Sequence, residues 1–340
     1  MSDEQNEKIR VLVCADFSDE IMDELRAISD RLHIEKRHPE VPTPAYQDID
    51  ILYTIWHFPE PDQAPNLRWI QLHYAGMENI ADRPIGRVES VQITSCSGIH
   101  AVPITEYCIG MMLAWEYRLP EMLKNKEKSH WPKNPYSQFI PQTLRGQTLG
   151  IVGYGSIARE LARVADQMGM RVLATKRDLR TLTEENAYRE ADTGDPDAEI
   201  PDRLYPAEAL GAMVTECDFV VVTVPLTSAT HHLIDESILN KMRRDAVLIN
   251  IARGGVVDEA ALIKALQERK IAGAALDVFE EEPLPKESPL WGLDNVIITP
   301  HVAGNNTRYH QRAAAVFGEN LRRYLENQPL INRLDRNRGY

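Results

Sequence analysis

Residues 149–178 read LGIVGYGSIARELARVADQMGMRVLATKRD, and this stretch decides the fold of the second half of the chain. An apolar, strand-like run leads into a glycine-rich turn, and a helix-forming segment and a second apolar run follow it. Gly153, Gly155 and Ala158 fit the pattern G-x-G-x-x-G/A, whose glycines allow a tight turn and the close approach of a pyrophosphate. With strand and helix in this order, the pattern predicts a dinucleotide-binding unit; a tight turn without a nucleotide is the alternative.

The second apolar run ends in Thr175, Lys176 and Arg177, where a site for NAD usually has an acidic residue that binds the ribose 2′-hydroxyl. A carboxylate repels a 2′-phosphate, whereas Lys176 and Arg177 attract it and the hydroxyl of Thr175 can add a hydrogen bond. We therefore predict NADP(H) as the preferred cofactor and NAD(H) as the second choice. The alternative is that both cations only cap a surface loop while NAD is used.

Both halves of the chain alternate strand-like and helix-like segments. Strands are expected at residues 9–14, 50–56, 69–74, 147–152, 171–174, 219–224, 246–251, 273–277 and 295–299. Apolar residues at helical spacing predict helices at 104–115 and 308–325. This alternation predicts an α/β fold with parallel sheets and helices on both faces. The acidic segment 181–203 has little periodicity and is expected to be a solvated surface insert.

Length and composition limit the classes of protein to which the chain can belong. A chain of 340 residues suggests two domains, and a net charge of −13 argues against binding to nucleic acid. The first residues lack the apolar core of a secretory signal, and no apolar stretch is long enough to span a membrane. The four cysteines are scattered in apolar surroundings, so we expect buried free thiols, no metal site and a cytoplasmic location.

Three residues with acid–base or anion-binding side chains each follow an expected strand. Arg253 lies in VLINIARGGVVDEAAL, Glu282 in AGAALDVFEEEPLP and His301 in NVIITPHVAG. The carboxyl ends of parallel strands meet at one edge of a sheet, which is where ligands usually bind. A guanidinium, a carboxylate and an imidazole at that edge can hold a 2-oxo or 2-hydroxy acid and move a proton to or from its oxygen.

Five segments in this order resemble those of the D-isomer-specific 2-hydroxyacid dehydrogenase family. They are GIVGYGSIA, FVVVTVPLTSATHHLI, LINIARGGVVDEAAL, GAALDVFEEEPLP and NVIITPHVAG, and the resemblance covers nearly the whole chain. It implies two Rossmann/flavodoxin-like domains with parallel sheets. The substrate-binding (catalytic) domain would comprise residues 1–118 and 305–340, and the inserted dinucleotide-binding domain residues 119–304. The family also leads us to expect a homodimer.

By this resemblance, Arg253 binds the substrate carboxylate and carbonyl, His301 is the acid/base, and Glu282 keeps His301 protonated. Among three consecutive glutamates, Glu282 is chosen because it directly precedes the proline. Ala75 and Gly76 match a turn whose N–H groups hold the substrate carboxylate. The glycine-rich turn, the cations after it and further family positions supply the expected cofactor contacts: Gly153, Gly155, Ser156, Ile157, Lys176, Arg177, Val224, Pro225, Thr230, Ile251, Ala252, Asp277 and Gly304.

Together these features predict an NADPH-preferring reductase of small 2-oxoacids, with glyoxylate and hydroxypyruvate as the first candidate substrates. A phosphoglycerate-dehydrogenase-like enzyme is an alternative within the family. An alternative from another class is a non-catalytic NAD(P)-sensing protein of the same fold, which would bind the dinucleotide with little turnover. For the insert 181–203, the sequence favours an inert role over an influence on cofactor choice.

Overall fold

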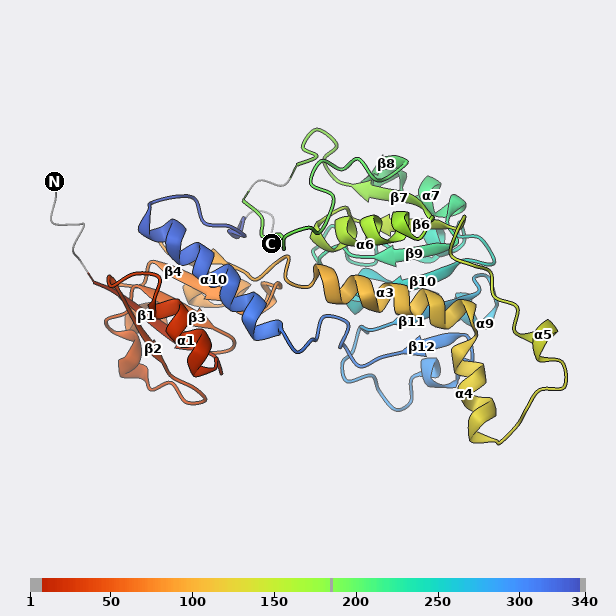
Figure 1. Cartoon of the computed structure of the whole chain (residues 1–340), viewed down its shortest axis with the longest axis horizontal. Coiled ribbons are helices and arrows are strands. Elements are labelled where there is room, and N and C mark those ends of the chain that lie inside the picture. Colours follow the sequence, from red (N-terminus) through yellow and green to blue (C-terminus); the bar gives the residue numbers. More distant parts are fainter. Residues whose placement is uncertain (1–7, 184–185, 337–340) are drawn as a thin grey trace. The chain divides into compact units, whose positions relative to one another are not determined.

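The computed structural model of the chain describes residues 8–183 and 186–336. The chain divides into two compact units, which Figure 1 shows with their elements labelled. Unit 1 comprises Met1–Ile99, Glu185–Glu190 and Asn306–Tyr340, and unit 2 comprises His100–Glu184 and Ala191–Asn305. Each unit is a parallel sheet with helices on both faces, which confirms the predicted fold class.

Unit 1 contains a five-stranded sheet in the order β2-β1-β3-β4-β5, and neighbouring strands all run parallel. The strands are β1 (Ile9–Cys14), β2 (Leu32–Lys36), β3 (Ile51–Thr54), β4 (Trp69–Leu72) and β5 (Gln92–Thr94). The strand order reverses between β1 and β3. The loops after these two strands therefore lie where ligands of such sheets usually bind.

Two helices far apart in the sequence, α1 (Asp19–Arg26) and α10 (Tyr309–Leu325), cover one face of this sheet. Met22 of α1 and Phe317 of α10 pack in one cluster with Val11 of β1. The other face is covered by short helical turns that connect the strands. The C-terminal segment is thus part of the core of unit 1, which is discontinuous in sequence.

Unit 2 contains a seven-stranded parallel sheet in the order β12-β11-β10-β9-β6-β7-β8. The strands are β6 (Thr148–Val152), β7 (Arg171–Lys176), β8 (Arg203–Pro206), β9 (Phe219–Val222), β10 (Val247–Asn250), β11 (Gly273–Leu276) and β12 (Val296–Ile298). The strand order reverses between β6 and β9. This arrangement is typical of sheets that bind a dinucleotide at the switch point.

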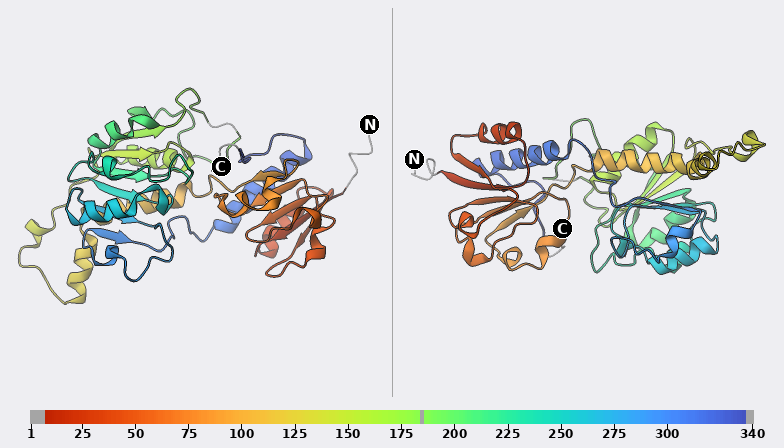
Figure 2. Two further views of the ribbon diagram at one scale, coloured as in Figure 1. Left: turned by 180° about the vertical axis from the view of Figure 1, so that it is seen from behind. Right: turned by 90° about the horizontal axis from the view of Figure 1, so that it is seen from below.

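Alternate residues of β6 pack on opposite faces of the unit 2 sheet. On one face, Ile151 packs with α3 (Ala101–Glu116) and α6 (Ser156–Gln167). On the other face, Val152 packs in the cluster that includes α9 (Glu259–Gln267). Figure 2 shows the helices on the two sides of the sheet. Both faces are therefore buried, as expected for a parallel sheet.

The other helical elements of the described residues are short. They are η2 (Thr43–Tyr46), η3 (Pro61–Gln63), α2 (Glu78–Ala81), η4 (Pro84–Arg87), α4 (Leu119–Glu127), α5 (Pro135–Gln138), η5 (Ala207–Ala209), α7 (Leu210–Met213), η6 (Val214–Glu216), α8 (Glu236–Leu239), η7 (Gly254–Val256) and η8 (Pro289–Gly292). The segment after α4 contains Pro132, Pro135 and Pro141 and forms only the short helix α5, because proline cannot continue a helix.

The observed division of the chain differs from the expected domain boundary at residue 118 by the helix α3. This helix lies in unit 2, which begins at His100. Cys108 and Met112 of α3 pack with Ala158 and Leu161 of α6 and are themselves fully buried. The apolar stripe of α3 therefore finds its partners on the face of the second sheet, a choice that the stripe alone does not specify.

The described residues of the insert 181–203 are mostly exposed or half-buried and form no helix or strand before β8, in line with the expectation, but specific contacts hold several of them in place. Residues 186–190 belong to unit 1, where Tyr188 packs beside apolar residues of α10. The N–H of Tyr188 donates to Oδ1 of Asn332 (3.0 Å), and Nε of Arg312 lies 3.0 Å from Oε2 of Glu190. These contacts give the insert a defined place.

All four cysteines are buried and none forms a disulfide, which confirms the prediction of buried free thiols. Burial raises the pKa of the thiols of Cys14, Cys96 and Cys217 to about 12. Burial also raises the pKa of Cys108. A thiol that stays protonated is a poor nucleophile, so these residues are structural.

A buried amide ties the C-terminal helix to the sheet of unit 1. Nδ2 of Asn320, on α10, donates to Oε1 of Gln71 on β4 (3.1 Å) and to the carbonyl of Ile331 (3.1 Å). Oδ1 of Asn320 accepts from the N–H of Ile331 (2.8 Å). Because Asn320 and Gln71 are fully buried, water cannot replace a hydrogen bond that either side chain loses.

We expect Asn320→Ala to destabilise unit 1 by about 2–3 kcal/mol, because it removes the partner of the backbone N–H and carbonyl of Ile331. It also removes one of the two hydrogen bonds to the amide oxygen of Gln71, which still accepts from the hydroxyl of Thr94 (2.8 Å). The midpoints of urea and thermal unfolding measure the loss. Glu319→Ala is the matched control on the same helix, since Glu319 forms an exposed ion pair with Arg323 worth about 0.5 kcal/mol. Equal losses of stability in the two variants would show that the buried amide contributes no more than the exposed ion pair.

Candidate active site

His301 follows β12 at the carboxyl edge of the unit 2 sheet. Its φ of 54° is in the left-handed region, which is uncommon for a residue with a side chain. The N–H of His301 donates to the carbonyls of Asp277 (2.8 Å) and Thr299 (3.2 Å). A conformation of this kind persists only where the surroundings hold it, and such residues cluster at functional sites.

The buried carboxylate of Asp277, which directly follows β11, holds the loop that carries His301. Its Oδ1 accepts from the hydroxyl of Thr299 (2.6 Å) and the N–H of Val302 (2.9 Å), and its Oδ2 accepts from the N–H of Ala303 (2.8 Å). Asp277 is 1% exposed, so water does not compete for these bonds. Beyond the cofactor contact expected for Asp277, the structure gives this side chain a role in positioning the histidine loop.

Glu282 forms an ion-pair contact with His301. Its Oε2 lies 2.7 Å from Nδ1 of the imidazole, and its Oε1 accepts from the N–H of Phe279 (3.0 Å). Because a carboxylate only accepts, we assign the shared proton to Nδ1, which leaves Nε2 as the ring nitrogen that can face a ligand. The side chains of His301 and Glu282 are 50% and 35% exposed, so a small molecule can reach them.

Arg253 follows β10, the strand next to β11. A buried amide shapes its turn: Oδ1 of Asn250 accepts from the N–H of Ala252 (3.1 Å), and Nδ2 donates to the carbonyl of Arg253 (3.2 Å). Nη1 of Arg253 donates to the carbonyl of Ala252 (2.8 Å). The guanidinium is thus held at the carboxyl edge that also carries Glu282 and His301.

The next residue, Gly254, lets the arginine turn touch the loop that leads to Glu282. A Cβ at this position would lie 1.8 Å from the backbone carbonyl carbon of Phe279. Any other residue would force the two loops apart. The three predicted catalytic residues therefore stand at the ends of three adjacent strands, β10, β11 and β12, with their loops in direct contact.

The glycine-rich turn after β6 is packed against both neighbouring strands. Gly153 has a φ of 96°, and its N–H donates to Oγ1 of Thr175 at the end of β7 (3.0 Å). A Cβ on Gly153 would lie 2.5 Å from Cγ1 of Val224, which follows β9. Both the conformation and the close approach therefore require glycine.

Helix α6 starts directly after this turn, with Gly155 as its N-cap and Ser156 and Ile157 as its first residues. The first N–H groups of a helix have no acceptor within the helix and carry the positive end of its dipole. Ala158 is fully buried, so the helix lies close to the sheet. The predicted dinucleotide-binding geometry, a tight turn that ends at a helix N-terminus, is thus present.

Lys176 and Arg177 lie beside this turn because of the strand register. Val152 pairs with Thr175, so the residue after β6 and the last residue of β7 are neighbours at the same edge. Lys176 is half-buried and Arg177 is exposed. Thr175 is buried and its hydroxyl accepts from the N–H of Gly153, so it supports the turn.

The remaining expected cofactor contacts of unit 2 also follow its strands. The loop after β9 is closed by Oγ1 of Thr230, which donates to the carbonyl of Pro225 (2.6 Å). Ile251 and Ala252 are buried directly after β10. Gly304 lies after the histidine loop, where a Cβ would lie 2.8 Å from the ring of His100. These residues line the same edge of the sheet as the glycine-rich turn.

The sequence model of the family described as "D-isomer specific 2-hydroxyacid dehydrogenase, NAD binding domain" matches residues 109–303. The chain belongs to this family. A glyoxylate reductase from Thermofilum pendens is 37% identical over 269 residues, which are 78% of this chain and 74% of the relative. A (S)-sulfolactate dehydrogenase from Chromohalobacter salexigens is 35% identical over 265 residues, 77% of this chain and 78% of the relative.

Solved structures of D-isomer-specific 2-hydroxyacid dehydrogenases have the same fold. One from Xanthobacter autotrophicus, in complex with NADPH and MES, matches with a TM-score of 0.77 and 27% identity, covering 97% of this chain and 100% of that chain. This 2-hydroxyacid dehydrogenase is therefore an oxidoreductase acting on 2-hydroxy acids, and its second unit is built to bind a nicotinamide dinucleotide.

The expected substrate-binding residues of the dehydrogenase lie in unit 1. Ala75 and Gly76 follow β4 at the carboxyl edge of the five-stranded sheet. Nearby, Tyr53 and His73 are core residues, with the Tyr53 hydroxyl 2.6 Å from Nδ1 of His73. Trp56, two residues after β3, is mostly exposed. Of these aromatic residues, the exposed Trp56 is the one a ligand can reach.

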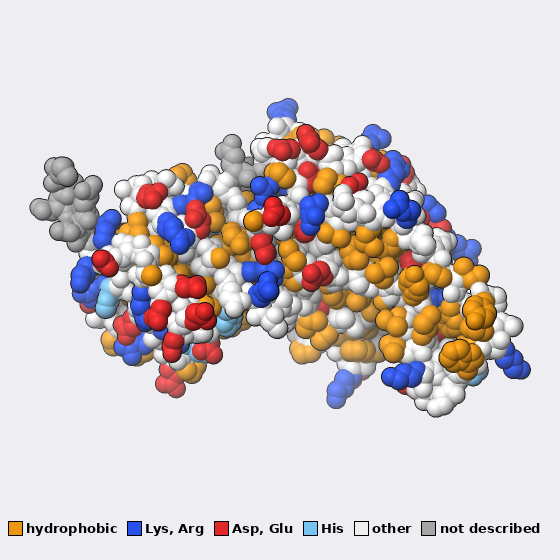
Figure 3. Space-filling view, viewed as in Figure 1, with side chains coloured by type: hydrophobic (Ala, Val, Ile, Leu, Met, Phe, Trp, Pro, Cys, Tyr) orange, Lys and Arg blue, Asp and Glu red, His pale blue; other side chains and the backbone are white. Residues whose placement is uncertain are grey.

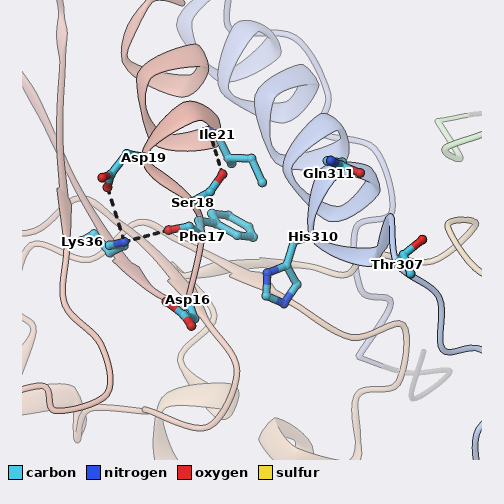
Figure 4. Close-up of a pocket in the computed structure, with 9 residues that line it drawn as sticks. All are labelled: Asp16, Phe17, Ser18, Asp19, Ile21, Lys36, Thr307, His310 and Gln311. Carbon is cyan, nitrogen blue, oxygen red and sulfur yellow. Dashed lines mark hydrogen bonds and ion pairs between the residues drawn. The ribbon is translucent and has the colours of Figure 1, made fainter.

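A pocket of unit 1, shown in Figure 4, opens beside α1 and the start of α10. Nζ of Lys36 donates to the carbonyl of Phe17 (2.7 Å) and lies 3.8 Å from Asp19. The ring of His310 contacts that of Phe17 edge-on, with the ring centroids 5.8 Å apart. None of the predicted site residues lines this pocket.

Several positioning residues of the dehydrogenase escaped sequence reasoning. Asn250 is a polar residue inside an apolar strand, and that pattern is the signal that could have revealed it. The support that Asp277 gives to the histidine loop carries no comparable signal, because its partners, the hydroxyl of Thr299 and two backbone N–H groups, come after another strand. Within residues 8–183 and 186–336, no group of three or more His, Cys, Asp or Glu side chains could hold a metal ion. In the same residues, every helix is too short or too polar to cross a bilayer.

Proposed function

We propose that the protein is an NADPH-preferring reductase of small 2-oxoacids, in which His301 is the acid/base, Glu282 its partner and Arg253 the carboxylate anchor. The observation that carries the proposal is the contact of 2.7 Å between Nδ1 of His301 and Oε2 of Glu282, one strand away from Arg253. This arrangement matches the chemical needs of reducing a ketoacid, which are a proton donor at the oxygen and a cation at the carboxylate.

The proton comes from His301. With Nδ1 held by Glu282, the imidazolium presents its Nε2–H to the carbonyl oxygen and donates the proton as that oxygen becomes a hydroxyl. By accepting the Nδ1–H, Glu282 fixes the orientation of the imidazole ring. The bound nicotinamide supplies the hydride in reduction. In the reverse direction, neutral Nε2 accepts the hydroxyl proton.

Arg253 orients the substrate in this proposal. A guanidinium carries donors in a planar fork that matches a carboxylate, and fixing the carboxylate fixes which face of the carbonyl is attacked. For Ala75 and Gly76, in the turn after β4, the proposed role is to bind substrate through their backbone N–H groups, as the resemblance to the family implies. Arg253 emerges from a turn that Asn250 rigidifies, so little ordering is required when the acid binds.

The preference for NADPH rests on Lys176 and Arg177. Both follow the residue that pairs with Val152, so they stand beside the glycine-rich turn where the adenosine ribose is expected. The next carboxylate, Asp178, accepts from the N–H of Arg180 (2.9 Å) and the hydroxyl of Thr181 (3.2 Å), which hold it in its own turn. The related dehydrogenase from Xanthobacter autotrophicus was solved with NADPH.

We take glyoxylate and hydroxypyruvate as the first candidate acids, in line with the glyoxylate reductase from Thermofilum pendens. The relative that is a (S)-sulfolactate dehydrogenase has nearly the same identity, so a panel of 2-oxoacids is the right assay. A dinucleotide-sensing protein of this fold would bind NADPH and oxidise it with none of these acids. The four buried free thiols support a reducing, cytoplasmic location.

We also propose a homodimer formed through the surface of α3, α4 and α5. Figure 3 shows hydrophobic side chains gathered over the region of α3 and α4. The exposed residues of this region include Leu119, Leu123 and Ile140, and Trp131 and Tyr136 are 84% and 94% exposed. Contiguous apolar surface of this kind marks an interaction site, and two copies of one chain offer each other the same surface.

We expect kcat/KM with glyoxylate or hydroxypyruvate to be about tenfold or more higher with NADPH than with NADH, because two cations meet the 2′-phosphate. Lys176→Asp should reverse this order, since a carboxylate repels the phosphate and accepts from the ribose hydroxyl. Absorbance at the NADPH band measures both. Lys270→Asp, at a surface lysine after α9, should keep the preference. A strong preference of the unaltered enzyme for NADH contradicts the assignment.

His301→Asn should lower kcat by about 10²–10⁴-fold, because the variant lacks the general acid. Glu282→Gln should also lower kcat, because an amide can turn its NH₂ towards Nδ1 and then no longer accepts the Nδ1–H that orients the ring. Glu281→Gln removes the same charge from the exposed neighbour and should leave kcat unchanged. A kcat that Glu282→Gln does not lower would show that the pair is misassigned.

Sedimentation velocity at micromolar concentration should show a dimer for the unaltered protein and a monomer for Leu123→Asp, because the substitution places a charge in the apolar surface of α4. Lys126→Asp is the control, since it introduces the same carboxylate at a polar position of the same helix. The proposed surface is wrong if the unaltered protein is monomeric or if both variants remain dimers.

A further inference from the structure

The residue between the two glycines of the dinucleotide-binding turn is held by the acidic insert. Tyr154 is buried, and its hydroxyl donates to Oδ2 of Asp195 at a distance of 2.5 Å. Asp195 is 5% exposed and also accepts from the N–H groups of Glu199 and Ile200 (3.1 Å each). A short hydrogen bond from a hydroxyl to a carboxylate in a buried place is a strong one.

A second contact ties the insert to the start of α6. The guanidinium of Arg159, which is buried, donates to the carbonyls of Leu182, Asp195 and Pro196. The same guanidinium lies 5.0 Å from the centre of the Tyr154 ring. One side chain of the dinucleotide-binding helix thus contacts the insert near its start, at Leu182, and again in its middle, at Asp195 and Pro196.

A third contact comes from the next residue of α6. Oε2 of Glu160 accepts from the N–H of Gly194 (2.6 Å), and the same carboxylate receives Nε and Nη2 of Arg163 at 2.8 Å and 2.6 Å. Glu160 is buried, so this contact is sheltered from water. The insert therefore contacts the turn at Tyr154 and the first part of α6 at Arg159 and Glu160.

We propose that the insert 181–203 braces the glycine-rich turn in its cofactor-binding geometry and that Asp195 is a positioning residue for dinucleotide binding. Gly153, with a φ of 96°, and Gly155 leave this turn more conformational freedom than other residues would. A flexible turn must be ordered when the pyrophosphate binds, and a turn already held by Tyr154 avoids that cost. The inference rests on the proposed dinucleotide site and gives the acidic insert a function.

The test is a double-mutant cycle on Kd for NADPH. Tyr154→Phe removes only the hydroxyl and leaves the other contacts of Asp195 intact, so it isolates the link between insert and turn. We expect Tyr154→Phe and Asp195→Ala each to raise Kd about tenfold. The double variant should raise it by the same factor, because both substitutions remove the same hydrogen bond between Tyr154 and Asp195. kcat at saturating NADPH should stay near its original value while KM for NADPH rises.

Asp235→Ala is the matched control, because Asp235 caps α8 and accepts from Ile238 and Ser237, away from the turn. It should lower the thermal unfolding midpoint about as much as Asp195→Ala and leave Kd within about twofold. If Kd for NADPH is unchanged in both Tyr154→Phe and Asp195→Ala, the proposed bracing role of the insert is wrong, whereas the proposed cofactor site is unaffected. An unaltered protein that binds neither NADPH nor NADH overturns the proposed cofactor site and the brace with it.

Discussion

Parallel pairing of β6 with β7 and β9 determines where the chemistry of unit 2 lies. All seven strands point the same way, so every loop that leaves a carboxyl end emerges at one edge. That edge carries the glycine-rich turn, the cations Lys176 and Arg177 at the end of β7, and the loops with Arg253, Glu282 and His301. Neither a dinucleotide nor a ketoacid could be held by these residues if one of these strands ran in the opposite direction.

Within this frame, buried polar side chains turn flexible loops into defined ones. Asp277 holds the histidine loop, Asn250 the arginine turn and Asp195 the tyrosine of the glycine-rich turn. Each is nearly inaccessible to water. Asp277 and Asp195 bond to backbone or hydroxyl groups of another segment, and Asn250 bonds to the backbone of the turn that directly follows it. Leaving such a group unpaired is costly, so each loop is stable in one conformation. The exposed pair of His301 and Glu282 is thus carried on loops that are held in place.

Much of the fold could be predicted because long apolar runs and helical stripes are unambiguous. β1 and α10 have nearly the predicted bounds. The short strands were missed for physical reasons: β5 has three residues, and β2 has five whose burial alternates like a surface strand. Such segments become strands only because a neighbour offers hydrogen bonds. The stripe of α3 was recognised, but its assignment to unit 2 depends on the complementary surface of α6.

The sequence by itself determined the family, the α/β class and the set of candidate site residues, because these depend on local patterns and residue chemistry. Only the tertiary structure decided how those residues are held. It placed Glu282 against His301, buried Thr175 beneath the turn and exposed Trp56. In the folded protein, residues of the insert also form hydrogen bonds with Tyr154, Arg159 and Glu160. These contacts join residues 19 to 41 positions apart, and no periodicity along the chain records such pairings.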